Sequence, residues 1–254
     1  MRRLYIILAC LIFCITTYED VSASCQKRAI SDIKDGELWH KSFFSVELPE
    51  FLRQALEVLR QPLEDRHITV SRISGTVDYP CNFMFVASMN PCPCGYYNHP
   101  TKACVCTPGQ ISRYLNKISG PLLDRIDIQC EIQPVPFDQL SQGAPGESSA
   151  AIRERVVAAR AIQAERFKDT PGVYCNAQMS SKMLRRYCAI DDNSMRLLRT
   201  AMDRYDMSAR AYDRIIRVAR TIADLHACPD ILPGHIREAI SYRALDRSTW
   251  GTTF

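Results

Sequence analysis

The chain has 254 residues, of which 46% are hydrophobic and 24% charged, a composition typical of a globular protein. Its length corresponds to one large domain or two smaller ones, and it contains no internal repeat or low-complexity tract. The formal net charge of +4 permits nucleic-acid binding but does not predict it, because a binding footprint needs basic residues clustered on one face.

The N-terminal segment resembles a secretory signal. Arg2 and Arg3 precede an apolar run from Leu4 to Ile15, and residues 21–23 form a small-residue motif of the kind that signal peptidases cleave. The run is too short to span a membrane. Residues 1–45 are therefore predicted to form a separate N-terminal segment, either signal-like or spurious.

Residues 43–80 predict a strand, a helix and a hairpin. An apolar strand covers residues 43–46, and a helix follows with Pro49 near its first turn. The core face of this helix is a leucine stripe: Leu52, Leu56, Leu59 and Leu63. Apolar residues at 68 and 70 and again at 77 and 79 flank Ser74-Gly75-Thr76, which predicts a β-hairpin.

The stretch 83–132 contains the densest pattern. Phe83–Ala87 is an unbroken apolar run, which predicts a fully buried parallel strand, and Asn90 follows at its carboxyl end. A helix is expected over 110–118, ended by Gly120-Pro121, and a strand over 126–132. In open α/β sheets ligands bind at the carboxyl ends of strands, so Asn90 lies where a ligand-sensing side chain is expected.

The C-terminal part is predicted to be all helical. Residues 140–149 form a Gly/Ser/Pro-rich linker, and a helix begins near Ser149. Further helices are expected over 179–188, 193–205, 208–226 and 233–246. The prediction is an α/β protein with a partial core at 46–137 and a helical domain, the lid, at 148–254.

Two Cys-x-Cys pairs make a candidate metal site. Four thiolates can hold one tetrahedral Zn²⁺, and the loop between the pairs is long enough to fold them together. Four protein ligands leave no open position, so such a site is structural. The alternative is a pair of disulfides or free thiols; disulfides suit an exported protein, whereas a metal suits the cytosol. The four residues are Cys92, Cys94, Cys104 and Cys106.

Four other polar residues carry a functional and an ordinary interpretation. Glu47 can activate a water at a strand end or simply favour a helix start, and Asn90 can sense a ligand or simply complete a turn. Arg125 can stabilise phosphoryl-transfer charge or pair with its neighbour Asp124. Arg210 lies in the first turn of a predicted helix, where a cation opposes the dipole, and this placement suggests an anionic ligand.

Several catalytic motifs are absent from the sequence. No glycine is followed by lysine, so there is no G-x-x-x-x-G-K-[ST] phosphate-binding loop, and no G-x-S-x-G, H-E-x-x-H or G-x-G-x-x-G occurs. The five histidines have no metal-ligand or triad spacing and are interpreted as structural or surface residues.

Taken together, several long motifs resemble one family, the magnesium-chelatase-like AAA+ ATPases of the ComM/YifB competence-protein branch. The resemblance runs from Glu47 to about residue 247. The motifs occur in the expected order: ELPEFLRQALEVLRQPLEDR, ITVSRISGTVDYP, FMFVASMNPCPCGYY, CTPGQISRYLNKISGPLLDRID and SARAYDRIIRVARTIADL.

The resemblance implies a role for each candidate residue. Glu47 matches the Walker B glutamate, Asn90 the sensor-1 residue, Arg125 the arginine finger offered to a neighbouring subunit and Arg210 the sensor-2 arginine of the lid. We expect Glu47, Asn90 and Arg210 to share one cleft around ATP and Mg²⁺. The cysteines match a cluster in the same place in this branch, and the hairpin matches an insertion directed toward substrate or pore.

The resemblance also implies partners and a compartment. Relatives form ATP-driven hexameric rings that act on branched DNA during competence and recombination, in the cytoplasm. The expected partners are therefore DNA and either identical or complete AAA+ subunits, with no membrane partner. Secretion directed by residues 1–23 is the alternative compartment.

The sequence departs from the family pattern at two points. Val46 stands where the family has the aspartate that helps to hold Mg²⁺, and the Walker A lysine is missing. We therefore predict a fragment of the ATPase that is inactive alone. The alternatives are a catalytically inactive binding or regulatory protein, exported or not, and a gene fragment without function.

Overall fold

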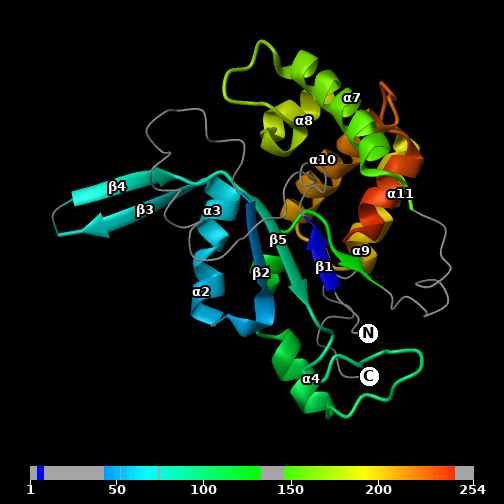
Figure 1. Cartoon of the computed structure of the whole chain (residues 1–254). Coiled ribbons are helices and arrows are strands. Elements are labelled where there is room, and N and C mark those ends of the chain that lie inside the picture. Colours follow the sequence, from blue (N-terminus) through cyan, green and yellow to red (C-terminus); the bar gives the residue numbers. More distant parts are fainter. Residues whose placement is uncertain (1–4, 9–42, 52, 74, 133–145, 244–254) are drawn as a thin grey trace.

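The computed structural model describes residues 5–8, 43–51, 53–73, 75–132 and 146–243. An α/β part carries a four-stranded sheet and a separate two-stranded hairpin, and a helical lid follows (Figure 1). The predicted fold class, a partial AAA+ core followed by a helical domain, is thereby confirmed.

The main sheet has the strand order β2-β5-β1-β6. β2 (Phe43–Glu47) pairs with β5 (Met84–Met89) in parallel, as predicted, with Glu47 opposite Ser88. β1 (Tyr5–Leu8) runs antiparallel between β5 and β6 (Cys130–Glu131). β1 falls inside the apolar run interpreted as a signal, where the sequence predicted no strand; residues 9–42 lie outside the described part.

One face of β5 forms the centre of the α/β core. Phe85, Ala87 and Met89 are buried, whereas Met84, Val86 and Ser88 are only half-buried. The buried side chains pack against helices that follow β2 and β5, chiefly through Leu56 and Leu122. The strand is therefore buried on one face, not on both as the unbroken apolar run predicted.

The predicted long helix after β2 is two short ones. After the 3₁₀ turn η3 (Leu48–Glu50), α2 (Arg53–Val58) and α3 (Arg60–Asp65) follow each other directly. Pro62 has no N–H to donate to the carbonyl of Val58, which explains the break. The leucine stripe still faces the core: Leu56 is buried and Leu59 and Leu63 pack against it; Leu52 lies outside the described residues.

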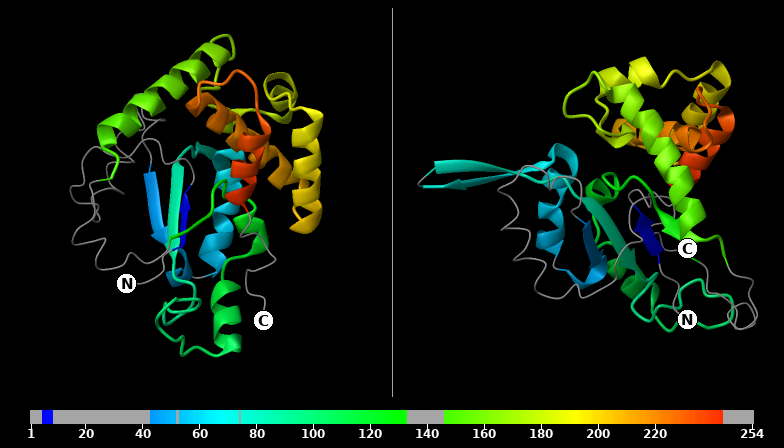
Figure 2. Two further views of the ribbon diagram at one scale, coloured as in Figure 1. Left: turned by 90° about the vertical axis from the view of Figure 1, so that its right-hand side faces the viewer. Right: turned by 45° about the horizontal axis from the view of Figure 1, so that its top comes forward.

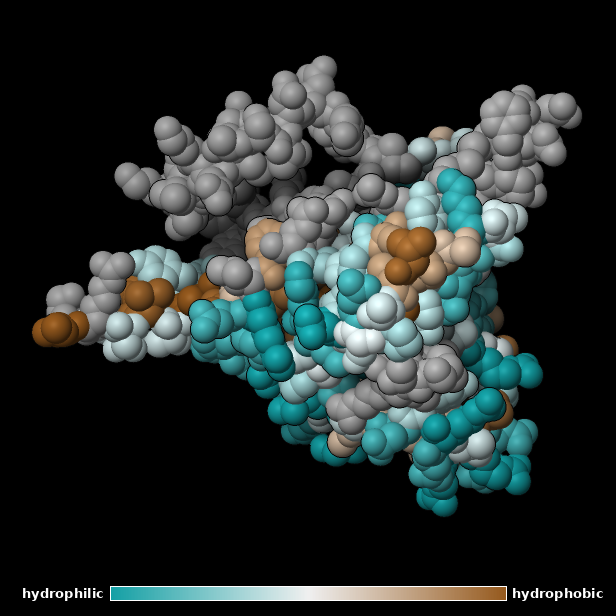
Figure 3. Space-filling model, turned by 90° about the horizontal axis from the view of Figure 1, so that it is seen from below, coloured by the Kyte–Doolittle hydropathy of each residue, from teal (hydrophilic) through white to brown (hydrophobic). Residues whose placement is uncertain are grey.

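The predicted hairpin is confirmed and projects from the molecule. β3 (His67–Arg72) and β4 (Gly75–Pro80) pair antiparallel from His67–Pro80 to Arg72–Gly75. Gly75 has φ +143°, which explains a glycine at this turn. Figures 1 and 2 show the hairpin extending away from the sheet, and Figure 3 shows apolar surface at its tip, where Ile73 is exposed; Val77 and Tyr79 are exposed farther back along β4.

The region after the cysteines differs from the prediction at three points. α4 (Pro108–Leu115) begins earlier, because Thr107 and Gln110 form a reciprocal capping box. Gly120-Pro121 do not end a helix but begin the short α5 (Gly120–Leu123), in which proline is well placed in the first turn. The predicted strand over 126–132 is reduced to the two residues of β6.

The lid contains five α-helices within its described residues, close to the predicted positions. They pack around a core that includes Leu198, Ile215 and Ile236. The helices are α7 (Ser149–Phe167), α8 (Ser181–Tyr187), α9 (Asp192–Arg204), α10 (Ala209–Leu225) and α11 (Pro233–Ser241), with a 3₁₀ turn η4 (Asn176–Gln178) before α8.

Backbone and side-chain contacts attach the lid to the α/β part. The N–H of Gln129 donates to the carbonyl of Tyr242 at 2.8 Å. The fully buried Arg243 donates to the carbonyl of Ile126 at 2.6 Å. Figures 1 and 2 show the lid at the amino end of β5, whereas the cysteine segment and α4 lie beyond its carboxyl end.

Candidate functional site

The structure brings the four cysteines of the two Cys-x-Cys pairs together. Their sulfur atoms all lie within 4.8 Å of one another. The Sγ of Cys92 is 3.3 Å from that of Cys94 and 3.7 Å from that of Cys104, and Cys94 and Cys104 are 3.5 Å apart. Four sulfurs at about 2.3 Å from one zinc ion are about 3.8 Å apart, so the cluster matches the spacing of a tetrahedral metal site.

Backbone N–H groups point at this cluster. The N–H of Tyr97 donates to the sulfur of Cys92 at 3.3 Å. Burial raises the pKa of the Cys94 thiol, but hydrogen bonds from the backbone of Tyr96 and Val105 lower the pKa by more than burial raises it. The resulting pKa is about 6. Burial, together with the neighbouring thiols, raises the pKa of Cys104 to about 12. The cluster thus already stabilises a thiolate at one position, which is the form that binds metal.

Local structure fixes both ends of the cysteine segment. Cys92 lies three residues after the end of β5 and is buried, while Cys106 precedes Thr107, the residue that caps α4. Gly95 turns the chain with φ +78°, and its N–H donates to the carbonyl of Cys92 at 3.0 Å. Among the described residues no two cysteines form a disulfide, which leaves a metal or free thiols.

Glu47 and Asn90 lie at the same edge of the sheet. Glu47 ends β2, Asn90 follows β5, and the two strands are parallel with Glu47 opposite Ser88. The side-chain oxygen Oδ1 of Asn90 is buried and has no hydrogen-bond partner among the described residues. An unsatisfied buried amide oxygen costs about 1–3 kcal/mol, so the side chain of Asn90 is placed to accept a hydrogen bond at this edge.

Arg125 and Arg210 meet elsewhere, on the carboxylate of Glu64 in α3. Arg210 at the start of α10 donates to Oε1 of Glu64 at 3.0 Å, and Arg125 forms an ion pair with Oε2. Arg125 also donates to the carbonyls of Arg60 (3.0 Å) and Pro121 (2.6 Å). Its side chain is only 9% exposed, whereas that of Arg210 is 63% exposed.

The predicted site residues therefore form two groups within one chain. Glu47 and Asn90 lie at the carboxyl ends of β2 and β5, next to the cysteines. Arg125 and Arg210 lie together on Glu64, near the end of α3 that leads into the hairpin, and Figure 1 shows that end of α3 on the side of the lid. The expectation that Arg210 shares a cleft with Glu47 and Asn90 in the same chain is not met, because α10 begins beside α3.

Sequence reasoning missed the carboxylates that organise the arginines. Glu64 binds Arg125 and Arg210, and Asp127 pairs with Arg214 of α10. The spacing of Asp127 two residues after Arg125 gives no signal, since its partner Arg214 comes from the distant lid. Asp224, four residues after Arg220 on α10, was recognisable only as a helical ion pair.

The fold and these sites define a two-part protein: an α/β core with a four-cysteine cluster at its strand ends, followed by a helical lid. Two family models match it, that of the magnesium chelatase subunit ChlI over residues 29–140 and that of its C-terminal region over 146–243. The chain belongs to the magnesium-chelatase-like family, in its ComM/YifB-type branch.

Three relatives illustrate the match. The uncharacterized protein YifB of Salmonella typhimurium is 42% identical over 207 residues, and the competence protein ComM of Haemophilus influenzae is 42% identical over 205. The uncharacterized protein Rv2897c of Mycobacterium tuberculosis is 38% identical over 200 residues. The alignments cover 79–80% of this chain but only 39% of each relative, so the chain spans about two fifths of their length.

One further property concerns membranes. Within the described residues, no helix combines the length and the apolar character that crossing a bilayer requires.

Proposed function

We propose that this chain supplies part of an ATP-hydrolysing site in a AAA+ assembly of the ComM type, which remodels DNA during competence and recombination. The observation that carries this proposal is the position of Glu47 and Asn90 at one sheet edge, where the amide oxygen of Asn90 is buried and has no hydrogen-bond partner among the described residues. A water held against the γ-phosphate of ATP at that edge would donate a hydrogen bond to this oxygen.

The two arginines fit a site at a subunit boundary. Phosphoryl transfer spreads negative charge over the transferred group, and arginines supplied by a neighbour stabilise it. Arg125 and Arg210 lie together but apart from Glu47 and Asn90 of their own chain. Arg125 and Arg210 therefore contribute to the nucleotide site of the next subunit. In a ring, each chain would contribute its two arginines at one subunit boundary and Glu47 with Asn90 at the other.

The chain lacks two parts of that site. It has no Walker A lysine to hold the phosphates, and Val46 replaces the aspartate that helps to bind Mg²⁺. Bound ATP·Mg²⁺ would supply the phosphoryl group and its charge neutralisation, while Glu47 would orient the attacking water and Asn90 would hold it. The chain alone is expected to hydrolyse ATP at a negligible rate.

The cysteine cluster fits a structural zinc ion. Cys92, Cys94, Cys104 and Cys106 offer four sulfurs at tetrahedral spacing, and backbone N–H groups stabilise thiolate there. A bound zinc would fix the segment that follows Asn90 and begin α4 at a defined position. Such a thiolate site suits the reducing cytosol, which is the compartment we propose.

Mixed assembly tests the proposal. A complete family member whose residue aligned with Arg125 is changed to alanine should regain ATP hydrolysis when this chain is added. Arg125→Lys in this chain, which keeps the charge but not the bidentate fork, should restore much less. ATP turnover by this chain alone that Glu47→Gln abolishes would contradict the predicted inactivity, and failure to stimulate any partner would contradict the shared site.

A further inference from the structure

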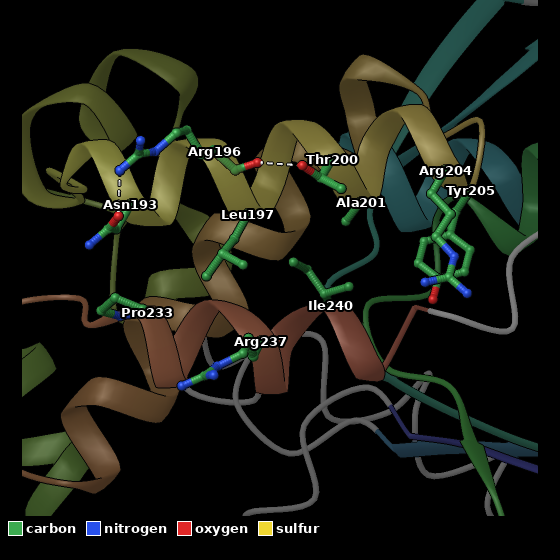
Figure 4. Close-up of a pocket in the computed structure, with 10 residues that line it drawn as sticks. All are labelled: Asn193, Arg196, Leu197, Thr200, Ala201, Arg204, Tyr205, Pro233, Arg237 and Ile240. Atoms are coloured by element: carbon green, nitrogen blue, oxygen red, sulfur yellow. Dashed lines mark hydrogen bonds between the residues drawn. The ribbon is translucent and has the colours of Figure 1, made fainter.

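A groove runs between α9 and α11 in the lid. It has a volume of about 520 Å³ (Figure 4). Ten side chains line it: Asn193, Arg196, Leu197, Thr200, Ala201, Arg204, Tyr205, Pro233, Arg237 and Ile240. No proposed role of the nucleotide site uses any of them.

Cationic groups line this groove and carboxylates do not. Arg196, Arg204 and Arg237 are exposed, and no ion pair among the described residues includes any of them. Elsewhere in the lid, arginines on α10 are paired: Arg217 with Asp213 and Arg220 with Asp224. The groove therefore concentrates three exposed guanidinium groups outside any ion pair of the described residues, with the carboxylate of Asp191 near enough to Arg196 to interact with its charge.

The helical period explains why these residues share one face. Asn193, Arg196, Thr200 and Arg204 are three or four residues apart along α9, so they form one row. Leu197 of α9 and Ile240 of α11 meet beneath this row and form an apolar floor (Figure 4). Arg199 lies on another face of α9 and is not part of the groove.

The groove also presents an aromatic ring at one end. The guanidinium of Arg204 lies 5.5 Å from the ring centre of Tyr205, which is half-buried. Asn193 accepts from Arg196 at 2.6 Å, which holds that guanidinium at the opposite end. Thr200 lies between them, with its hydroxyl bonded to the carbonyl of Arg196 at 3.0 Å.

The length of the row selects an extended ligand. At 1.5 Å of rise per residue, Arg196 and Arg204 are about 12 Å apart along α9, too far for one phosphate group to contact both. A polymer with a phosphate on every unit can contact both ends and Arg237 across the groove. An unpaired base can stack on Tyr205, a combination of backbone charges and aromatic contact that is typical of single-stranded nucleic-acid binding.

We infer that the α9–α11 groove binds the phosphate backbone of single-stranded DNA, with Arg196, Arg204 and Arg237 as the phosphate contacts and Tyr205 as a base contact. This inference rests on the proposed function, which makes DNA the substrate, and assigns that substrate a surface on the lid. The contacts are to phosphates, so the binding is expected to be independent of sequence and strongly dependent on salt.

The test is fluorescence anisotropy of a labelled oligothymidylate with the full chain at several salt concentrations. The double variant Arg204→Ala/Arg237→Ala should bind at least about tenfold more weakly than the unchanged chain. The slope of log K against log salt should fall by about 1.4, because each phosphate contact contributes about 0.7 on single strands. The control Arg185→Ala/Arg199→Ala loses the same charge from exposed positions outside the groove and should bind within about twofold.

Three results would overturn the inference in distinguishable ways. Equal weakening by both double variants means general charge attraction and not a groove. Displacement of the oligonucleotide by polyglutamate at an equal concentration of charge means that the groove accepts acidic peptides instead. If the chain without substitutions binds no oligonucleotide, both the groove assignment and DNA as the substrate are wrong. The ATP-site experiment above is independent of all three results. Circular dichroism of each variant confirms that the lid remains folded.

Discussion

Arg125 and Arg210 bind the two oxygens of one carboxylate, that of Glu64. The first arginine comes from the core and the second from the lid, so Glu64 connects the two parts of the chain at this point. The two ion pairs differ in environment, since the Arg125 side chain is 9% exposed and the Arg210 side chain 63% exposed.

The first prediction concerns how much each of these two arginines contributes to the stability of the protein. Arg125→Ala removes a nearly buried donor from two backbone carbonyls and from Glu64, and should lower the free energy of unfolding by about 2–3 kcal/mol. Arg210→Ala removes one exposed, solvent-screened pair and should change it by less than about 0.5 kcal/mol. Urea unfolding followed by circular dichroism measures both; equal losses would show that Arg125 is not held as the structure has it.

The second prediction concerns the buried charge network of the lid. The carboxylate of Asp224, 1% exposed, accepts from Arg166 and Arg220 and from the amide of Asn176. Asp224→Ala leaves two largely buried guanidinium groups without their partner and should lower the free energy of unfolding by about 3–5 kcal/mol.

Asp213→Ala is the matched control for Asp224→Ala, on the same helix. Asp213 is 29% exposed and lies 4.0 Å from Arg217, so its loss should cost less than about 1 kcal/mol. Chemical denaturation gives both values. A similar cost at the two positions would contradict the ranking by burial.

The third prediction concerns the cysteine cluster. Protein purified without chelator should contain about one equivalent of Zn²⁺, and Cys104→Ser should reduce it to less than about half. Cys175→Ser, outside the cluster, should leave the content unchanged. Elemental analysis measures the metal; a folded, unmodified chain without zinc would leave four free thiols as the correct description.

The fourth prediction concerns pH and His235. Its Nδ1 accepts from the N–H of Leu232 at 3.1 Å at the start of α11, and burial, together with His226 and Arg220, holds its pKa below the ordinary 6.5. The unfolded chain therefore takes up this proton first as the pH falls. Stability should be complete above about pH 7 and should decrease as the pH falls through about 6.5, by up to about 1.4 kcal/mol per pH unit.

His235→Gln provides the comparison for this pH dependence. Glutamine can accept the same backbone hydrogen bond without titrating in this range. Unfolding free energies at about pH 7.5 and 5.5 should differ less in the variant than in the unchanged chain. An identical difference in both proteins would assign the pH dependence to another group.

Much of the architecture was predictable from local patterns. The hairpin followed from alternating apolar residues around Gly75, and the lid helices followed from apolar spacing and from capping residues such as Ser208. The Thr107–Gln110 capping box was also visible in the sequence, and using it would have placed the start of α4 correctly. These features depend on residues within one or two turns of each other.

The site was predictable in part for the same reason. Cys92, Cys94, Cys104 and Cys106 are close in sequence, so a short loop suffices to bring their sulfurs within 4.8 Å. Glu47 and Asn90 lie at the same edge of the sheet because two adjacent parallel strands end there. Neither placement requires knowledge of how the lid packs.

The sequence by itself determined the family, because its motifs can be read directly along the chain. It also determined the class of elements and the cysteine cluster, because these depend on contacts between residues near one another in the chain. Only the tertiary structure decided that Arg210 joins Arg125 on Glu64 and that Arg196, Arg204 and Arg237 line one groove. Those arrangements depend on where the lid packs against the core and where α11 packs against α9. Such packing is set by the shapes of buried surfaces that lie far apart in the sequence, and no local pattern encodes it.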